Sequence, residues 1–284
     1  MVINELLEKS RALMKGIPYG NPILESILIL SKLLDKDKVY IYTHGQEKVS
    51  EELANEFMVL VEKRARGYPM SYLLGEKEFM GLDLHIEEGV LIPRPDTEIL
   101  VEYIIKEINK NHKGKKISLL DIGVGSGAIS LSLAKEFPNI EVYGIDLYEK
   151  PLSLANKNKE SLGLDNIYFF QSNLFEKVDP KKKFHIIVSN PPYIKTKDIE
   201  DLQKDVKDFE PLSALDGGSD GLDFYRKITR DAKNFLYKNG LLAYEIGYNQ
   251  SQQVSEIMLK EGYYHIEKLK DFQDYYRVIA GRWK

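Results

Sequence analysis

Short runs of consecutive apolar residues alternate with longer amphipathic segments from residue 117 onward. Such runs are typical of strands buried on both faces of a parallel sheet, and the amphipathic segments are typical of helices that cover it. The expected strands are residues 117–122, 142–145, 167–170, 184–189 and 241–245, and the expected helices are residues 128–137, 151–162, 222–238 and 250–261. Two final strands, residues 264–269 and 275–280, have no helix between them and must pair antiparallel. The pattern predicts an α/β fold with a doubly wound, mostly parallel, seven-stranded sheet that ends in an antiparallel hairpin.

The first part of the chain has a different pattern. Apolar residues recur at helical spacing between residues 2 and 66, where Asn21-Pro22 is a helix start with asparagine as the N-cap. Residues 67–95 alternate around glycines as a β-hairpin does, and a helix follows with Asp96 or Thr97 expected as its N-cap. We therefore expect a helical bundle for substrate recognition over residues 1–75, a hairpin linker over residues 76–93 and a catalytic domain over residues 94–284.

The apolar strand at residues 184–189 runs directly into Asn190-Pro191-Pro192-Tyr193. The two prolines remove backbone donors and hold the chain extended at the carboxyl end of a strand, where open α/β sheets bind ligands. The Asn190 side-chain oxygen and the Pro191 carbonyl can each accept one hydrogen of a planar NH2 group, and the Tyr193 ring can pack against that group. A simple turn that ends a buried strand is the alternative interpretation, but the four-residue string is more specific than a turn requires. We predict that Asn190, Pro191, Pro192 and Tyr193 bind the substrate and support catalysis.

A glycine-rich turn, Gly123-Val124-Gly125-Ser126-Gly127, joins the first strand of this region to a helix, and Asp146 ends the next strand. This arrangement is typical of a nucleoside site, in which the acidic residue takes both ribose hydroxyls. The glycines alone fit NAD as well as S-adenosylmethionine. The G-x-G-x-G spacing, the terminal hairpin and Asp121, which can hold an ammonium group but would repel a pyrophosphate, favour S-adenosylmethionine. Asn173 follows the third strand, where it can accept from an adenine amino group. The candidate cofactor-binding residues are Asp121, Gly123, Val124, Gly125, Ser126, Gly127, Asp146, Asn173, Leu174 and Asn190.

Composition narrows the function classes further. The formal net charge of −4 gives no overall attraction for nucleic acid, so we expect no direct nucleic-acid binding. The chain has no cysteine and its five histidines form no ligand-spaced pair, so we expect no metal site. The amino terminus is unlike a secretory signal, and no apolar run is long enough to span a bilayer. These features predict a cytoplasmic protein that does not bind membranes.

The motifs at residues 121–127 and 190–193, together with Asp146, resemble those of the amino-methyltransferases within the class I S-adenosylmethionine-dependent methyltransferases. Additional motifs resemble one branch of this class, the HemK-type peptide-chain-release-factor glutamine methyltransferases. These motifs are Arg66-Gly67-Tyr68-Pro69, Tyr72, Gly75, Glu78-Phe79, residues 92–98, Phe209-Glu210-Pro211, Gly217-Gly218, Asp220-Gly221-Leu222 and Glu245-Ile246-Gly247. The resemblance covers nearly the whole chain and is weakest over the first 60 residues. It implies methyl transfer from S-adenosyl-L-methionine to the side-chain nitrogen, N5, of the glutamine in the Gly-Gly-Gln motif of class-1 peptide chain release factors. Asn173 is a departure, because the family often has an acidic residue there.

Three further interpretations stay open at this point. The arrangement at residues 190–193 that accepts from an NH2 group, called the clamp below, would also suit two other enzymes. One is a DNA adenine-N6 methyltransferase, which the net negative charge of the chain disfavours. The other is a methyltransferase for a ribosomal-protein glutamine, which residues 92–98 disfavour. A non-catalytic, cofactor-loaded adaptor on translation factors is disfavoured by the intact clamp. Arg94, placed between two prolines, is expected to bind substrate at the rim of the site, although residues 92–98 alone are more simply read as punctuation before a helix.

Overall fold

The computed structural model describes residues 1–17 and 20–284, which form two compact units. One unit is helical and consists of Met1–Glu76 together with Gln203–Phe209. Its helices are α1 (Ile3–Met14), α2 (Pro22–Leu34), α3 (Lys38–Thr43), α4 (Glu51–Ala65), α5 (Met70–Leu74) and α9 (Lys204–Lys207). The Asn21 side chain caps α2 as predicted, accepting from the backbone of Ile23 and Leu24.

Two features hold the helical unit together. The apolar faces of α1, α2 and α4 bury a continuous core, and a buried ion pair joins Glu25 of α2 to Arg64 of α4 at 2.8 Å. The segment Gln203–Phe209 belongs to this unit although it lies far along the chain, and the Phe209 ring packs edge-to-face on Tyr68 with centroids 5.3 Å apart. The sequence pattern did not predict that association.

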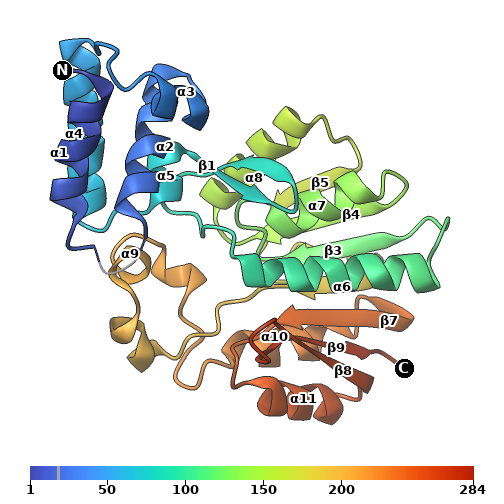
Figure 1. Ribbon diagram of the computed structural model, residues 1–284. Coiled ribbons are helices and arrows are strands. Elements are labelled where there is room, and N and C mark those ends of the chain that lie inside the picture. The colour runs from blue at the N-terminus through green and yellow to red at the C-terminus, as the bar shows by residue number, and fades with distance from the viewer. Residues whose placement is uncertain (18–19) are drawn as a thin grey trace. The chain divides into compact units, whose positions relative to one another are not determined.

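The second unit consists of Lys77–Leu202 and Glu210–Lys284 and contains the seven-stranded sheet. A hairpin of β1 (Glu76–Phe79) and β2 (Leu82–His85) precedes it. The sheet strands are β3 (Ser118–Ile122), β4 (Glu141–Asp146), β5 (Ile167–Gln171), β6 (Phe184–Ser189), β7 (Leu236–Glu245), β8 (Tyr264–Lys270) and β9 (Tyr276–Arg282), in the order β5-β4-β3-β6-β7-β9-β8. All neighbours are parallel except β7 with β9 and β8 with β9, which confirms the predicted sheet and its terminal hairpin (Figure 1).

Helices cover both faces of the sheet. The helices of the second unit are α6 (Pro95–Asn111), α7 (Ala128–Glu136), α8 (Glu149–Leu162), α10 (Asp223–Ala232) and α11 (Ser251–Lys260), and short 3-10 turns lie at Thr196–Asp201 and Leu212–Ala214. Alternate residues of each strand, such as Leu120, Ile187 and Leu242, bury themselves in the core beneath α10 and α11, while their neighbours face α6, α7 and α8. The chain winds outward in both directions from β3 and β6, so the sheet has its topological switch point between these strands.

Two local predictions are wrong. The helix expected over residues 222–238 ends at Ala232, and β7 already begins at Leu236, which pairs with Phe184. Asn239-Gly240 therefore lies within an irregular stretch of β7, with Asn239 at φ 64°, instead of stopping a helix. The pattern misled because the apolar side chains at the end of the expected helix fit a strand equally well.

The second wrong prediction concerns the start of α6. This helix begins at Pro95 with Arg94 as its N-cap residue, and no side chain caps it. Asp96 and Thr97 lie in the first turn instead, where Asp96 pairs with Arg277 at 3.1 Å and Thr97 donates to Glu245. Both candidate cap residues therefore bond to distant residues of the fold and not to the backbone at the start of α6.

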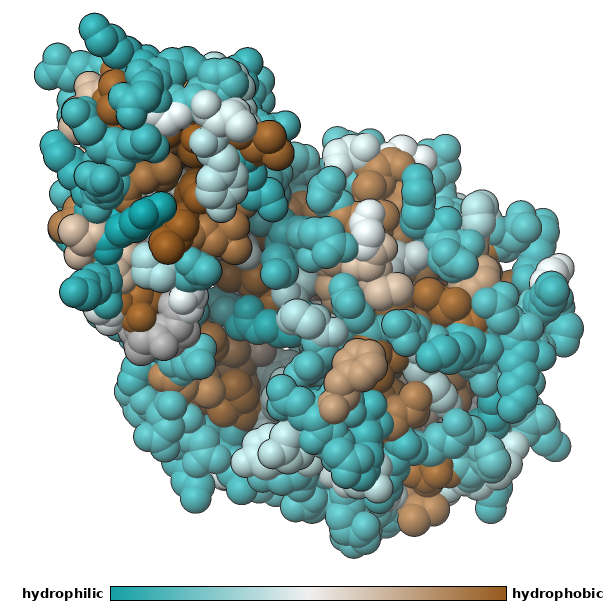
Figure 2. All heavy atoms as spheres, in the orientation of Figure 1, coloured by the Kyte–Doolittle hydropathy of each residue, from teal (hydrophilic) through white to brown (hydrophobic). Residues whose placement is uncertain are grey.

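The surfaces drawn in Figure 2 are mainly hydrophilic, with apolar patches between them. Across residues 1–17 and 20–284, no helix combines the length and the apolar character needed to cross a membrane. The same described residues bring together no group of three or more histidine, aspartate or glutamate side chains that could hold a metal ion.

Candidate active site

A cavity of about 760 Å³ opens at the carboxyl ends of β3, β4, β5 and β6, beside the switch point of the sheet. Its size is within the range of small-molecule sites. The sheet edge contributes Ile122, Gly123, Gly125, Ile145, Asp146, Ser172, Asn173, Leu174, Ser189, Asn190, Pro191 and Pro192. Further walls come from Gly89, Val90 and Leu91 before α6, from Leu147, Tyr148, Lys150 and Pro151 at the start of α8, and from Pro211, Leu212, Ser213, Ala214, Asp216, Phe224 and Ile228. Most of the predicted site residues are therefore brought together around one cavity.

The three glycines of the turn after β3 have different roles. Gly123 and Gly125 line the cavity with φ of 81° and 58°, and a Cβ atom on either would meet open space. Side chains there would occupy the cavity from a strained backbone, so glycine keeps the floor open for a ligand. Gly127, at φ 89°, is a packing residue, because its Cβ would lie 2.6 Å from Leu131 Cδ1. Val124 and Ser126 are buried in the turn and do not line the cavity.

Two aspartates lie beside this turn. Asp121 is completely buried on the α7 face of β3, where its Oδ2 accepts a hydrogen bond of 2.5 Å from Ser130. Its Oδ1 accepts no hydrogen bond from the described residues, and burial raises the pKa of this carboxyl to about 7. A buried carboxylate oxygen without a donor is costly, and it fits a site that receives a cationic group from a ligand.

Asp146, at the end of β4, faces the cavity directly. Its Oδ2 accepts from Gly125 N and its Oδ1 from Tyr148 N, each at 3.1 Å, so the carboxylate is held in place by backbone on both sides. Burial raises the pKa of Asp146, and these backbone donors oppose the shift. Each oxygen retains a further lone pair, which leaves the group able to accept from two vicinal hydroxyls.

The turn after β5 places Asn173 and Leu174 in the cavity wall. The Asn173 amide nitrogen donates to Glu176 Oε1 at 2.7 Å, so its oxygen remains as an acceptor. Leu174 has a φ of 49°, in the left-handed region that non-glycine residues seldom occupy.

The segment after β6 turns the chain along the cavity wall. Asn190, Pro191 and Pro192 line the cavity, and the Asn190 Nδ2 donates to Thr97 Oγ1 at 3.2 Å. Tyr193 is placed differently from the expectation, because it is not among the residues that line the cavity. Its ring packs against the hydrophobic core, its hydroxyl donates to Glu245 Oε1 at 3.3 Å, and burial raises its pKa. Tyr193 therefore braces the segment from behind.

Arg94 also lies outside the residues that line the cavity. Its guanidinium forms an ion pair with the buried carboxylate of Glu210, which also accepts from the backbone of Ile92. The pair links the proline-rich entry of α6 to the segment that begins at Glu210, and Pro211 to Ala214 then form part of the cavity wall.

Sequence analysis gave no role to the residues that hold the Asn-Pro-Pro-Tyr segment, although the resemblance includes Glu245 and Gly217. Glu245 at the end of β7 is 1% exposed, and burial raises its pKa to about 7 while hydrogen bonds from Thr97 and Tyr193 oppose the shift. The Gln250 Nε2 donates to the Tyr193 carbonyl at 3.0 Å. Gly217 leaves no space for a side chain, because a Cβ there would lie 2.7 Å from Tyr193 Cα. The signal in the sequence was a carboxylate ending an otherwise apolar strand, which needs a partner when buried.

Comparisons with known proteins identify the fold and the family. A family model described as "Methyltransferase small domain" matches residues 95–206, and another described as "PrmC N-terminal domain" matches residues 5–75. The 16S rRNA N2 G1207 methyltransferase (RsmC) of T. thermophilus, solved in complex with AdoMet and guanosine, superimposes with a TM-score of 0.53 at 18% identity, covering 74% of this chain and 50% of that chain. The chain thus has the α/β fold of that structure and contains a domain that matches a methyltransferase family model.

Full-length relatives identify the family. The release factor glutamine methyltransferase of Clostridium acetobutylicum is 40% identical over 281 residues, which are 98% of each chain. That of Clostridium botulinum is 38% identical over 286 residues, which are 99% of each chain. This chain belongs to the release factor glutamine methyltransferase family.

Proposed function

We propose that this protein transfers a methyl group from S-adenosyl-L-methionine to the side-chain amide nitrogen, N5, of a glutamine in a peptide chain release factor. The carrying observation is that one cavity is lined both by Gly123, Gly125 and Asp146 and by Asn190-Pro191-Pro192, whose oxygens can accept from an NH2 group. The glutamine is that of the Gly-Gly-Gln motif of a class-1 release factor, and the reaction belongs to the cytoplasm, where termination takes place.

The residues around the cavity fit the cofactor. Asp146 would accept from the ribose hydroxyls, Gly123 and Gly125 would let the ligand approach the backbone, and the unpartnered Asp121 Oδ1 would receive the ammonium group. Asn173 has a free amide oxygen for the adenine amino group. When bound, S-adenosyl-L-methionine supplies an electrophilic methyl group on a sulfonium that is itself a good leaving group.

The protein's own groups then act on the amide. An amide nitrogen is a poor nucleophile because its lone pair is delocalised into the carbonyl. The Asn190 Oδ1 and the Pro191 carbonyl accept its two hydrogens, which shifts electron density onto nitrogen and orients the lone pair. The described residues place no strong base at this position, so the proton passes to water after transfer.

The helical unit is proposed to recognise the release factor. A loop bearing one glutamine offers little surface, whereas stable protein contacts bury about 1,000 Å² or more. Val39 and Tyr42 of α3 are 66% and 64% exposed, so this short helix presents two large side chains that a partner could cover. Replacing both by lysine should lower kcat/KM for a whole release factor and leave that for a short Gly-Gly-Gln peptide unchanged. Equal loss on both substrates would contradict this role.

A methyl-transfer assay tests the activity. The protein is incubated with labelled S-adenosyl-L-methionine and either a purified release factor or the same factor with its motif glutamine replaced by alanine. We expect label on N5 of that glutamine by mass spectrometry and none on the variant. No label on the factor, or label only on DNA or a ribosomal protein, would overturn the proposal.

Cofactor binding is tested separately with Asp146→Ala. Losing charge-assisted bonds to the ribose should weaken the affinity about 10- to 150-fold for each bond. Calorimetry that shows unchanged affinity, or tight binding of NAD, would contradict the cofactor site.

A further inference from the structure

A buried chain of hydrogen bonds lies behind the Asn190 side chain and joins three separate elements. Thr97 comes from the first turn of α6, Glu245 ends β7, and Asn190 follows β6. The Thr97 Oγ1 lies 2.5 Å from Glu245 Oε2 and 3.2 Å from Asn190 Nδ2. Thr97 and Glu245 are 4% and 1% exposed, so water does not compete for these bonds. None of these contacts involves Asp121, Asp146 or the glycine turn.

The chemistry of the three groups gives this chain a direction. Above about pH 7, the value to which burial raises the pKa of Glu245, its carboxylate is ionised and has only acceptors, and a hydroxyl has a single hydrogen to donate. Since Thr97 gives its hydrogen to Glu245, its oxygen can only accept from Asn190. The amide of Asn190 must therefore turn its NH2 group toward Thr97, and its oxygen is left for the cavity.

That direction matters because the two orientations of a carboxamide have almost the same shape. In one, Asn190 presents an oxygen to the substrate NH2 group. In the other, it presents its own NH2 group, so that donor faces donor and the substrate hydrogen has no acceptor. Shape alone cannot select the productive orientation.

We propose that Thr97 and Glu245 are positioning residues that fix the orientation of the Asn190 carboxamide so that its oxygen faces the substrate amide. This inference rests on the proposed function, because it assigns the free oxygen to the glutamine NH2 group. It adds to the proposed function that the orientation of Asn190 depends on one residue of α6 and one residue of β7.

A second set of contacts fixes the position of the Glu245 carboxylate itself. The Tyr193 hydroxyl donates to Glu245 Oε1 at 3.3 Å, so both carboxylate oxygens are engaged by donors. The Tyr225 hydroxyl donates to the backbone carbonyl of Glu245 at 2.9 Å. Glu245 therefore has little freedom to rotate away from Thr97, and the direction passed to Asn190 is fixed by the fold.

The test compares Thr97→Val with Thr97→Ser. Valine has nearly the shape of threonine but no hydroxyl, whereas serine keeps the hydroxyl. At pH 8.5, with saturating cofactor, we expect Thr97→Val to lower the single-turnover rate about 10- to 100-fold while cofactor affinity stays within about twofold. Thr97→Ser should recover the rate to within about threefold of the unsubstituted protein.

Thr229→Val is the matched control. Thr229 is also fully buried and its hydroxyl bonds to the Tyr244 hydroxyl at 2.9 Å, on the α10 face of the sheet. This variant should lose stability comparably and keep its single-turnover rate. A normal rate in Thr97→Val, or equal loss in Thr97→Ser and Thr97→Val, would overturn the positioning role.

A measurement on the protein without substrate separates this inference from the proposed function. The side-chain NH2 resonances of Asn190, assigned by their loss in Asn190→Ala, should exchange slowly with solvent in the unsubstituted protein and faster in Thr97→Val. Equal exchange in both would contradict the inference even where methylation of release factors is observed. Slow exchange without methylation would support the orientation and contradict the proposed function alone.

Discussion

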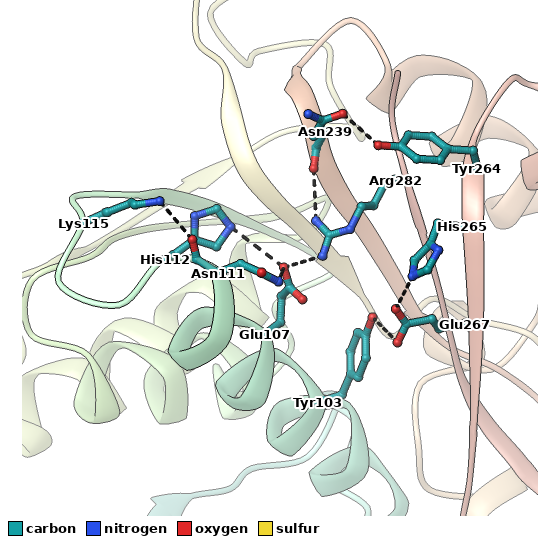
Figure 3. A network of polar contacts seen from close by, with 10 residues as sticks. All are labelled: Tyr103, Glu107, Asn111, His112, Lys115, Asn239, Tyr264, His265, Glu267 and Arg282. Carbon is teal, nitrogen blue, oxygen red and sulfur yellow. Dashed lines mark hydrogen bonds and ion pairs between the residues drawn. The ribbon is translucent and has the colours of Figure 1, made fainter.

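The two ends of the sheet carry cavities of similar volume and opposite character. The carboxyl end holds the cavity of about 760 Å³, with the unpartnered Asp121 Oδ1 behind it and the free oxygen of Asn190 in its wall. At the amino end, α6 and the neighbouring strands β6 to β9 line a cavity of about 810 Å³. Here the polar groups bond to one another: Arg282 donates to Glu107 Oε1 at 2.6 Å and to the Asn239 carbonyl at 3.2 Å, as Figure 3 shows.

This difference shows that volume does not identify a site. The amino-end network ties α6 to β7, β8 and β9: Tyr264 bonds to Asn239 at 2.8 Å, Asn111 to Glu107 at 2.9 Å, and Tyr103 reaches Glu267 (Figure 3). Its groups satisfy one another within the protein and stabilise the fold. The carboxyl end instead keeps acceptors that the fold leaves unmatched, which lowers stability until a ligand supplies donors.

The largest expected effect comes from removing an acceptor at the carboxyl end. Asn190→Ala should lower the single-turnover rate about 100- to 1,000-fold, the range seen when one preorganised hydrogen-bonding group is lost from an active site. Cofactor affinity should stay measurable. The control is Asn111→Ala, which removes an amide at the amino end. A near-normal rate in Asn190→Ala would show that the clamp does not activate the nitrogen.

Asp121→Asn should change affinity and stability in opposite directions. Losing a charge-assisted bond to the ammonium group weakens cofactor binding about 10- to 100-fold. Burial raises the folded-state pKa of Asp121 to about 7, above its unfolded value, so stability from this group is present at low pH and is lost as pH rises through 7. The variant should therefore melt at a higher temperature than the unsubstituted protein at pH 8, with the difference shrinking toward pH 5. Unchanged affinity together with an unchanged Tm would contradict both roles of the carboxylate.

The strand ends that meet at the carboxyl edge of the sheet could mostly be located from the sequence, for a physical reason. Strand ends are marked locally: a glycine turn, a terminal aspartate and a double proline each follow an apolar run, and parallel strands bring their carboxyl ends to one edge. The strand ends at Gly123, Asp146 and Asn190 could be located in this way, and all three residues line the cavity in the structure. The mostly parallel, seven-stranded sheet with its antiparallel end followed from the alternation of helices and strands together with the terminal hairpin.

The residue roles that could not be predicted from the sequence depend on contacts between residues far apart in the chain. Thr97 resembled a helix cap, but its bond to Glu245 joins residues 148 positions apart. Arg94 resembled a rim residue, and its partner Glu210 is 116 positions away. The amino-end network has no local motif, because its members come from α6, from the segment after it and from different strands of the sheet. The helix expected over residues 222–238 failed because a short apolar segment cannot be assigned by periodicity alone.

At the amino end, Arg282→Met should reduce stability and leave the chemistry intact. The Arg282 and Glu107 side chains are 18% and 6% exposed, so removing one partner leaves a largely buried charge with fewer donors. We expect a loss of about 2 to 3 kcal/mol in the free energy of unfolding. The control is Arg226→Met, whose ion pair with Asp220 is 48% and 45% exposed and should contribute less than about 1 kcal/mol. Weakened cofactor binding in Arg282→Met would contradict the separation of the two ends.

The smallest expected effect is a difference in the sign of the pH dependence of stability. Burial lowers the pKa of His112 and His185 at the amino end, so their contribution to stability is present above the unfolded value near 6.5 and is lost as pH falls. Burial raises the pKa of Asp121 and Glu245 to about 7 at the carboxyl end, so acidification favours the folded state there. Between pH 7.5 and 5.5, a His112→Gln/His185→Gln variant should thus lose less stability than the unsubstituted protein, by less than about 1 kcal/mol for each partly buried imidazole. Asp121→Asn should lose more, because it lacks a group whose protonation stabilises the fold. Denaturant titrations at the two pH values measure both differences, and the titrating groups that all the proteins share cancel from the comparison. Equal changes in all three proteins would show that the two ends do not differ in how they bind protons.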